Sequence, residues 1–125
     1  MGVSERNILL VEDEEDLLEL YKSFLESDGY VVETAAKGRD AVNKAKNKRF
    51  DMVILDIKLP DIMGDEVARE LKAIDESVII IMVTGFPSFQ ESIDALDLGI
   101  YDILLKPITA DELLRAARDA FSTSG

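Results

Sequence analysis

Five short apolar runs, separated by longer amphipathic segments, restrict the fold of this chain more than any other feature. The runs occupy residues 8–11, 30–35, 52–55, 78–83 and 103–105. All but one are rich in large aliphatic residues and lack a polar–apolar alternation, which is typical of strands buried on both faces of a parallel sheet. Run 30–35 is partly polar and is better suited to a sheet edge.

The segments between the runs have the apolar spacing of amphipathic helices. Predicted helices cover residues 17–25, 38–48, 67–74, 89–96 and 113–121. Gly29 stands where a C-terminal cap belongs, and Thr109 with Glu112 has the pattern of a capping box. The strict alternation predicts an α/β fold, a doubly wound five-stranded parallel sheet of order 2-1-3-4-5 with five helices.

The composition limits the chemistry. The chain has 125 residues, the size of a single domain over 1–125, and it contains neither cysteine nor histidine. Disulfides, Cys nucleophiles, Ser-His-Asp catalysis and most transition-metal sites are therefore excluded, and any metal would take oxygen ligands. The net charge of −12 argues against direct nucleic-acid binding, and the longest apolar run, six residues, is too short to span a membrane. These features predict a soluble cytoplasmic protein.

Carboxylates gather at one edge of the predicted sheet. Glu12 and Asp13 follow the first strand, and Asp56 follows the third strand, its neighbour in the predicted order. Sheets of this kind bind ligands at the carboxyl ends of their strands, near the point where the strand order reverses. Three converging carboxylates either raise one another's pKa or hold a hard cation, so this trio predicts a Mg²⁺ site that would also accept Mn²⁺.

A different interpretation suits the rest of the acidic segment "EDEED" at 12–16. Acids at a helix N-terminus are favourable with the helix dipole and can cap its free amides. This interpretation accounts for Glu14, Glu15 and Asp16. It does not account for Asp56, which ends an apolar strand in another part of the chain.

Two further polar residues end the remaining central strands. Thr84 follows run 78–83, and Lys106 follows run 103–105. Alone, Thr84 would be read as a helix cap and Lys106 as a solvated lysine. Together with the acids, they supply a hydroxyl and an ammonium for anionic oxygens, beside an Asp carboxylate that is a competent nucleophile. These are the groups that phosphoryl transfer to Asp56 needs.

The chain resembles the receiver domain of two-component response regulators, the CheY-like family. The resemblance covers about residues 6–121 and rests on four segments that occur in order at family-like spacing. They are "ILLVEDE", "DMVILDIKLPDIMG", "VIIIMVTG" and "GIYDILLKPI". Each segment alone is a weak signal, and the four together are a strong one. The resemblance implies a flavodoxin-like, CheY-like fold.

The resemblance also implies a role for each residue at the sheet edge. Asp56 would accept a phosphoryl group from a phosphohistidine on a sensor histidine kinase or phosphotransfer protein. Asp13 and Asp56 would bind Mg²⁺ through their side chains, Lys58 through its backbone carbonyl, and Glu12 through water. Such a domain catalyses its own phosphorylation and dephosphorylation, and so acts as a switch more than as a turnover enzyme.

The resemblance implies that the other two residues respond to the phosphoryl group. Lys106 would pair with Asp56 or with its phosphoryl group, Thr84 would move toward the phosphoryl oxygens, and the Lys106–Pro107 bond would be cis. The family usually has Tyr or Phe three residues before the lysine, where this chain has Ile103. Tyr101 lies two residues earlier, and strand parity predicts that it shares a sheet face with Ile103.

The resemblance places the switching surface on helix 4, strand 5 and helix 5. In this chain the surface would include Phe89, Gln90, Ile93, Asp94, Asp97, Asp102, Asp111, Arg115 and Arg118. Its mixed charge suits docking to a downstream protein or a phosphorylation-dependent homodimer, and it equally suits an ordinary solvated surface. No sequence feature identifies the downstream partner, and the chain reads equally as a stand-alone receiver and as one domain of a longer protein.

Three alternatives belong to other functional classes. A degenerate receiver would act as a phosphorylation-independent interaction module, and only Ile103 supports it. A haloacid-dehalogenase-like phosphatase would need a second Asp two residues after the first, where this chain has Lys58. A flavodoxin-like electron carrier would need a Ser/Thr/Gly-rich phosphate loop after the first strand, where the chain is acidic at 12–16.

Overall fold

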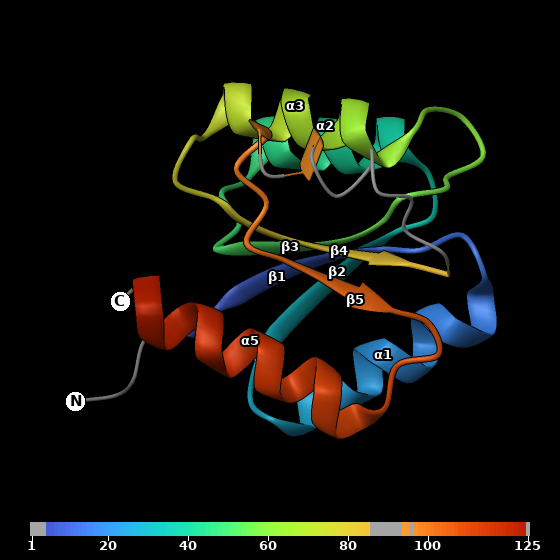
Figure 1. The fold of residues 1–125 in the computed structure, drawn as a ribbon, viewed down its shortest axis with the longest axis vertical. Coiled ribbons are helices and arrows are strands. Elements are labelled where there is room, and N and C mark those ends of the chain that lie inside the picture. The colour runs from blue at the N-terminus through green and yellow to red at the C-terminus, as the bar shows by residue number, and fades with distance from the viewer. Residues whose placement is uncertain (1–4, 86–93, 96, 125) are drawn as a thin grey trace.

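The strands form one parallel sheet in the predicted order. The computed structural model describes residues 5–85, 94–95 and 97–124. The order is β2-β1-β3-β4-β5, as the residue patterns and the resemblance predicted (Figure 1). The strands are β1 (Asn7–Val11), β2 (Val31–Ala35), β3 (Met52–Asp56), β4 (Ile79–Thr84) and β5 (Asp102–Leu105).

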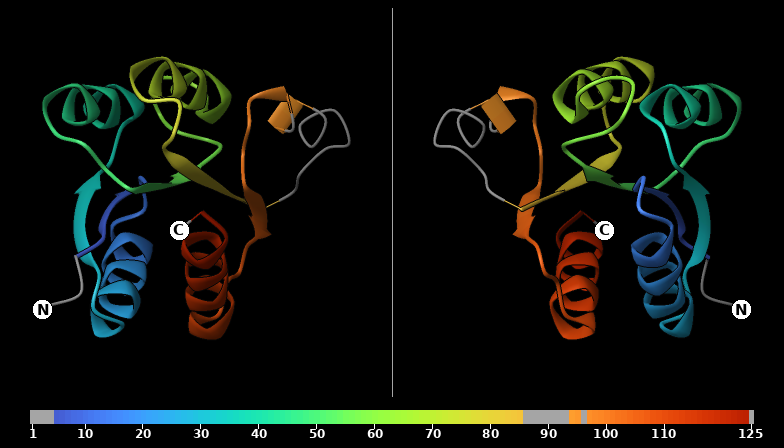
Figure 2. Two further views of the ribbon diagram at one scale, coloured as in Figure 1. Left: turned by 90° about the vertical axis from the view of Figure 1, so that its left-hand side faces the viewer. Right: turned by 90° about the vertical axis from the view of Figure 1, so that its right-hand side faces the viewer.

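Helices cover both faces of the sheet (Figures 1 and 2). One face carries α1 (Glu15–Ser27) and α5 (Ala110–Ser124), and the other carries α2 (Gly38–Asn47) and α3 (Gly64–Ile74). Most of the helix predicted over 89–96 lies outside the described residues. None of the helices in the described part of the chain is long and apolar enough to cross a membrane.

Successive residues of the central strands pack into two separate cores. In β1, Leu9 and Val11 join the core beneath α2 and α3, whereas Ile8 and Leu10 join the core beneath α1 and α5. All four side chains are almost completely buried. Burial on both faces is why the strand has no polar alternation, and each such side chain contributes about 1.5–3 kcal/mol of transfer free energy.

Each strand boundary matches the predicted run or differs from it by one residue, whereas helices α1, α3 and α5 extend two or three residues beyond their predicted ranges. Tyr30 precedes β2 and Val78 precedes β4, whereas Asp102 begins β5. The C-terminal cap at Gly29 is confirmed by its φ of +94°, and a hydrogen bond from the Tyr30 N–H to the Leu25 carbonyl closes the end of α1.

The predicted helix caps have different outcomes. The capping box before α5 is confirmed, because the Glu112 N–H donates to Thr109 Oγ1 at 3.1 Å and the Thr109 N–H donates to Glu112 Oε1 at 3.1 Å. Glu14 is the N-cap of α1, but its side chain makes no capping hydrogen bond. The capping prediction for Glu14 is therefore wrong, and only the dipole argument applies to Glu15 and Asp16 in the first turn.

Candidate phosphoacceptor site

The carboxyl ends of β1 and β3 bring three acids together. The strands pair with Val11 beside Leu55, so the next residues, Glu12 and Asp56, lie side by side. Glu12, Asp13 and Asp56 each place a carboxylate oxygen within 4.8 Å of the others. Glu12 and Asp56 are 2% and 7% exposed, whereas Asp13 is open to solvent. The convergence predicted from the sequence is present in the fold.

Lys106 connects the two buried acids. Its Nζ lies 2.8 Å from Glu12 Oε1 and 3.0 Å from Asp56 Oδ2. The contact with Asp56 agrees with the resemblance, but the direct contact with Glu12 was not predicted. Residues 12 and 106 are 94 positions apart, so no local pattern in the sequence could have indicated their contact.

The ion pairs shift the protonation of both partners. Burial alone would lower the pKa of Lys106, but its hydrogen bonds to Glu12 and Asp56 outweigh burial and raise that pKa above its usual value. Burial raises the pKa of Glu12, and the hydrogen bonds from Lys106 and from the Glu14 N–H offset only part of this increase. Lys106 therefore remains a cation at neutral pH.

The two oxygens of Asp56 have different partners. Oδ2 accepts from the Lys106 ammonium, and Oδ1 accepts from the Lys58 N–H at 3.1 Å. Gly64 packs behind this turn, because its N–H donates to the Ile57 carbonyl at 2.8 Å. A Cβ at Gly64 would lie 2.8 Å from the carbonyl oxygen of Asp56, so only glycine fits there. Gly64 ends one of the segments that carry the family resemblance, but the sequence alone indicated no role for it.

Thr84 ends β4 at the same edge of the sheet. It is 2% exposed, and its carbonyl accepts a hydrogen bond of 2.8 Å from the Lys106 N–H. The preceding residue, Val83, pairs with Asp56 in the sheet. The peptide bond between Lys106 and Pro107 is cis, as the resemblance implied. Residues from four strand ends thus meet at one place.

The donor set of the cluster fits a hard divalent cation. Its three carboxylates carry three negative charges when ionised, and Lys106 is the one basic side chain of the described residues that forms an ion pair with them. The remaining charge is close to −2. Carboxylate oxygens with this net charge are the ligands that Mg²⁺ and Mn²⁺ prefer.

Tyr101 lies directly before β5, at the edge of the sheet. Ile103 packs against the core beneath α2 and α3, as a side chain of β5. The Tyr101 hydroxyl lies 3.5 Å from Thr123 Oγ1 near the end of α5. The Tyr101 N–H donates to the Ile80 carbonyl of β4 at 2.8 Å, so the hydrogen bonding between these segments continues to Tyr101. The shared face of Tyr101 and Ile103 stays a prediction.

The predicted switching surface is described only in part. Phe89, Gln90 and Ile93 lie outside the described residues. The remaining members are exposed: Asp94, Asp97, Asp102, Asp111, Arg115 and Arg118. Arg118 pairs within the chain, because its Nε donates to Asp28 Oδ2 at 2.8 Å. That guanidinium fastens α5 to the turn after α1.

Known proteins share this fold and sequence pattern. A family model described as the response regulator receiver domain matches residues 8–118. The transcriptional regulatory protein YkoG of Bacillus subtilis is 34% identical over 119 residues, which are 95% of this chain and 52% of that protein. The response regulator ArlR of Staphylococcus aureus is 35% identical over 111 residues, which are 89% of this chain and 50% of that protein. The chain therefore spans about half the length of these curated relatives.

Solved structures agree over almost the whole chain. A CheY-like receiver domain protein from Methanospirillum hungatei superposes with a TM-score of 0.94 at 32% identity, covering 97% of both chains. The non-phosphorylated HemR receiver domain from Leptospira biflexa has a TM-score of 0.89 at 33% identity, covering 94% of this chain and 95% of that one. Both likenesses extend across the sheet and its flanking helices.

Proposed function

Because this chain belongs to the response-regulator receiver-domain family, we propose that Asp56 is its phosphoacceptor. The donor is a phosphohistidine on a sensor histidine kinase or a phosphotransfer protein. The observation that carries the proposal is the position of Asp56, a nearly buried carboxylate at a strand end that touches Lys106 and lies beside two further acids.

In the proposed transfer, a carboxylate oxygen of Asp56 attacks phosphorus, and the bond between phosphorus and the donor's histidine nitrogen breaks. The Lys58 N–H and the Lys106 ammonium hold the two Asp56 oxygens in fixed positions beforehand. The Lys106 ammonium also offsets the negative charge that reaches the site, and the Thr84 hydroxyl donates to a phosphoryl oxygen. Positioning and charge compensation supply most of the rate enhancement in such transfers.

The proposed Mg²⁺ ligands are the side chains of Asp13 and Asp56 and the Lys58 carbonyl, with Glu12 acting through water; Mn²⁺ would serve equally. A bound divalent cation neutralises phosphoryl oxygens during the transfer. The direct contact between Glu12 and Lys106 gives Glu12 a second role. In the unphosphorylated protein, Glu12 holds the Lys106 ammonium beside Asp56.

The proposed output is a switch, because receiver domains generally serve signalling rather than substrate turnover. The self-catalysed gain and loss of the phosphoryl group are part of the proposal. Phosphorylation adds about −1.5 to −2 charges at neutral pH. That charge biases the surface of helix 4, β5 and α5 toward a downstream protein or a second copy of the chain. A sensor kinase draws its phosphate from ATP, so we expect this exchange to occur in the cytoplasm.

No observation favours the degenerate receiver, the phosphatase or the electron carrier. A degenerate receiver would lack part of the acceptor site, whereas the fold brings Glu12, Asp13, Asp56, Thr84 and Lys106 to one edge.

The test is intact mass after incubation with Mg²⁺ and acetyl phosphate. We expect the wild type to gain one phosphoryl group and Asp56→Asn to gain none. Asp51→Asn is the matched control, because Asp51 lies just before the same strand, at its opposite end. A folded wild type that gains no mass, or an Asp56→Asn protein that gains as much as the wild type, would refute the assignment.

A further inference from the structure

A hollow lies at the end of the sheet opposite Asp56. It has a volume of about 490 Å³ and opens between the C-terminal ends of α2 and α3. Its floor is apolar, built from Phe50, Val53, Leu71 and Val78, each less than a tenth exposed. At its mouth Ile74, 40% exposed, adds apolar surface that solvent reaches. None of these residues belongs to the phosphoacceptor site.

The rim of this hollow is basic, although the chain as a whole is strongly acidic. Segment 44–49, "KAKNKR", holds four of the chain's 14 bases and no acid, in a chain of net charge −12. Three of these bases line the hollow: Lys46, Lys48 and Arg49. Asp75 is the single acid among its lining residues. An apolar floor thus stands beside a local concentration of positive charge.

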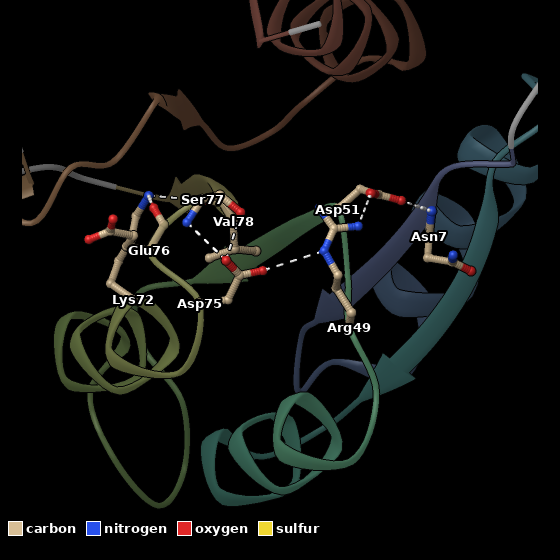
Figure 3. A network of polar contacts seen from close by, with 8 residues as sticks. All are labelled: Asn7, Arg49, Asp51, Lys72, Asp75, Glu76, Ser77 and Val78. Carbon is tan, nitrogen blue, oxygen red and sulfur yellow. Dashed lines mark hydrogen bonds and ion pairs between the residues drawn. The ribbon is translucent and has the colours of Figure 1, made fainter.

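Internal contacts hold the rim in place. Arg49 NH1 lies 3.0 Å from Asp51 Oδ1 and its Nε lies 3.7 Å from Asp75 Oδ2, so this side chain bridges the segments that precede β3 and β4 (Figure 3). Asp51 in turn accepts the Asn7 N–H at 2.8 Å, which ties the rim to β1 (Figure 3). The Lys72 ammonium donates to the Val78 carbonyl at 2.7 Å beside the same wall (Figure 3). The hollow is therefore preformed.

The charge of the rim is only partly neutralised. Lys48 pairs with Glu33, and its ammonium lies 5.5 Å from the centre of the Phe50 ring. Lys46 forms no ion pair with any described residue. The last carbonyl groups of α2 also face this end of the sheet and disfavour an anion. Lys48 and Arg49 are already paired with acids, so Lys46 is the base of the rim whose charge remains available to an anion.

We propose that this hollow binds a small amphipathic organic anion, an apolar chain that ends in a single carboxylate. Its volume falls within the range of about 300–1,000 Å³ that is usual for ligand pockets. The apolar part would lie on Phe50, Leu71 and Val78, and the carboxylate would face Lys46, while Arg49 keeps its pairs with Asp51 and Asp75. The site is independent of the proposed phosphoryl transfer, since it shares no residue with it.

The test uses octanoate as the probe, with the full chain followed by two-dimensional amide NMR. We expect saturable shifts in the amides of 45–50 and 71–78 and none around Asp56. Octylammonium has the same apolar chain with the opposite charge and should not saturate the site. Octanol, which has no charge, should bind about three- to fivefold more weakly than octanoate.

Two exposed positions test the two halves of the site. Lys46→Glu reverses the charge of that side chain, and Ile74→Glu places a negative charge, the same sign as that of octanoate, in the apolar mouth. Both should weaken octanoate binding at least about fivefold. Lys37→Glu is the matched control, an exposed lysine at the other end of the same helix, and should bind as the wild type does. The absence of saturable shifts at millimolar octanoate, equal binding of octylammonium, or equal weakening by Lys37→Glu would overturn the proposal.

Discussion

At the scale of single residues, Lys106 is the centre of the site. One ammonium contacts two carboxylates that are both nearly buried, and a fifth of its own side chain remains exposed. Removing the ammonium would leave two buried carboxylates without a compensating charge. The free-energy cost of that loss exceeds the net stabilisation that a buried ion pair contributes. Lys106 therefore has a structural role in the unphosphorylated protein in addition to its proposed role toward the phosphoryl group.

This role predicts a stability effect. Lys106→Met should lower the free energy of unfolding by about 1–3 kcal/mol without divalent cations, less than for a fully buried pair because solvent reaches the ammonium. Urea unfolding at neutral pH measures the difference. Lys58→Met is the control, because Lys58 contacts Asp56 through its backbone N–H, which the substitution keeps. Equal stability of the two variants would show that the lysine bridge contributes nothing.

The close packing at Gly64 leads to a second prediction, which concerns stability and phosphoryl uptake. A Cβ there would lie 2.6 Å from Ile57 Cα and 2.8 Å from the Asp56 carbonyl oxygen, both backbone atoms that cannot rotate away. Gly64→Ala should therefore cost about 1–3 kcal/mol of stability and should slow phosphoryl uptake, because the backbone of Asp56 must move. Gly85→Ala, whose Cβ would meet no heavy atom within 4 Å, is the control. A Gly64→Ala protein as stable and as readily phosphorylated as Gly85→Ala would show that the close packing at Gly64 does not constrain Asp56.

At the scale of elements, the loop after β3 is fastened to α2. Asp61 Oδ1 accepts the Gly38 N–H at 2.8 Å, and Oδ2 accepts the Arg39 N–H at 2.9 Å. Asp61 thus caps α2 from another part of the chain, in place of the N-cap residue Lys37, whose side chain makes no capping bond. These hydrogen bonds, with that from Arg39 the strongest influence, hold the pKa of Asp61 below its usual value.

The cap gives a prediction with a definite pH dependence. Asp61→Ala should lower the free energy of unfolding by about 1 kcal/mol at neutral pH. Because the pKa of Asp61 is lower in the folded protein than in the unfolded chain, this contribution is present above about pH 4 and is lost as the pH falls through the folded value. Denaturant unfolding of both proteins from pH 7 downward measures the difference, with the exposed Asp119→Ala as control. A difference that stays constant or grows toward acid pH would contradict the cap.

The elements also show what the sequence could and could not predict. The runs ILLV at 8–11 and VIIIMV at 78–83 indicate buried parallel strands. A strand buried on both faces has apolar residues at every position, and this is visible within each run alone. The capping box at Thr109 is equally local. The Asp61 cap and the contact between Lys106 and Glu12 were missed, because each joins segments whose proximity appears only once the loops are placed.

At the scale of the whole molecule, the two ends of the sheet have different chemistry. The carboxyl ends of the strands gather acids around Lys106, and the amino ends carry the basic rim at 46–49. A parallel sheet produces this separation, because every strand begins at one edge and ends at the other. The acceptor site was predictable for the same reason: residues that directly follow parallel strands share an edge wherever they lie in the sequence.

Asp56 alone is expected to carry the phosphoryl group. Borohydride reduces an aspartyl phosphate to homoserine, so treating the acetyl-phosphate-loaded protein with borohydride and sequencing its peptides by mass spectrometry locates the modified residue. We expect homoserine at position 56 and at no other aspartate. Homoserine at position 13 or elsewhere, or unmodified aspartate at 56 in a protein that has gained phosphoryl mass, would contradict this expectation.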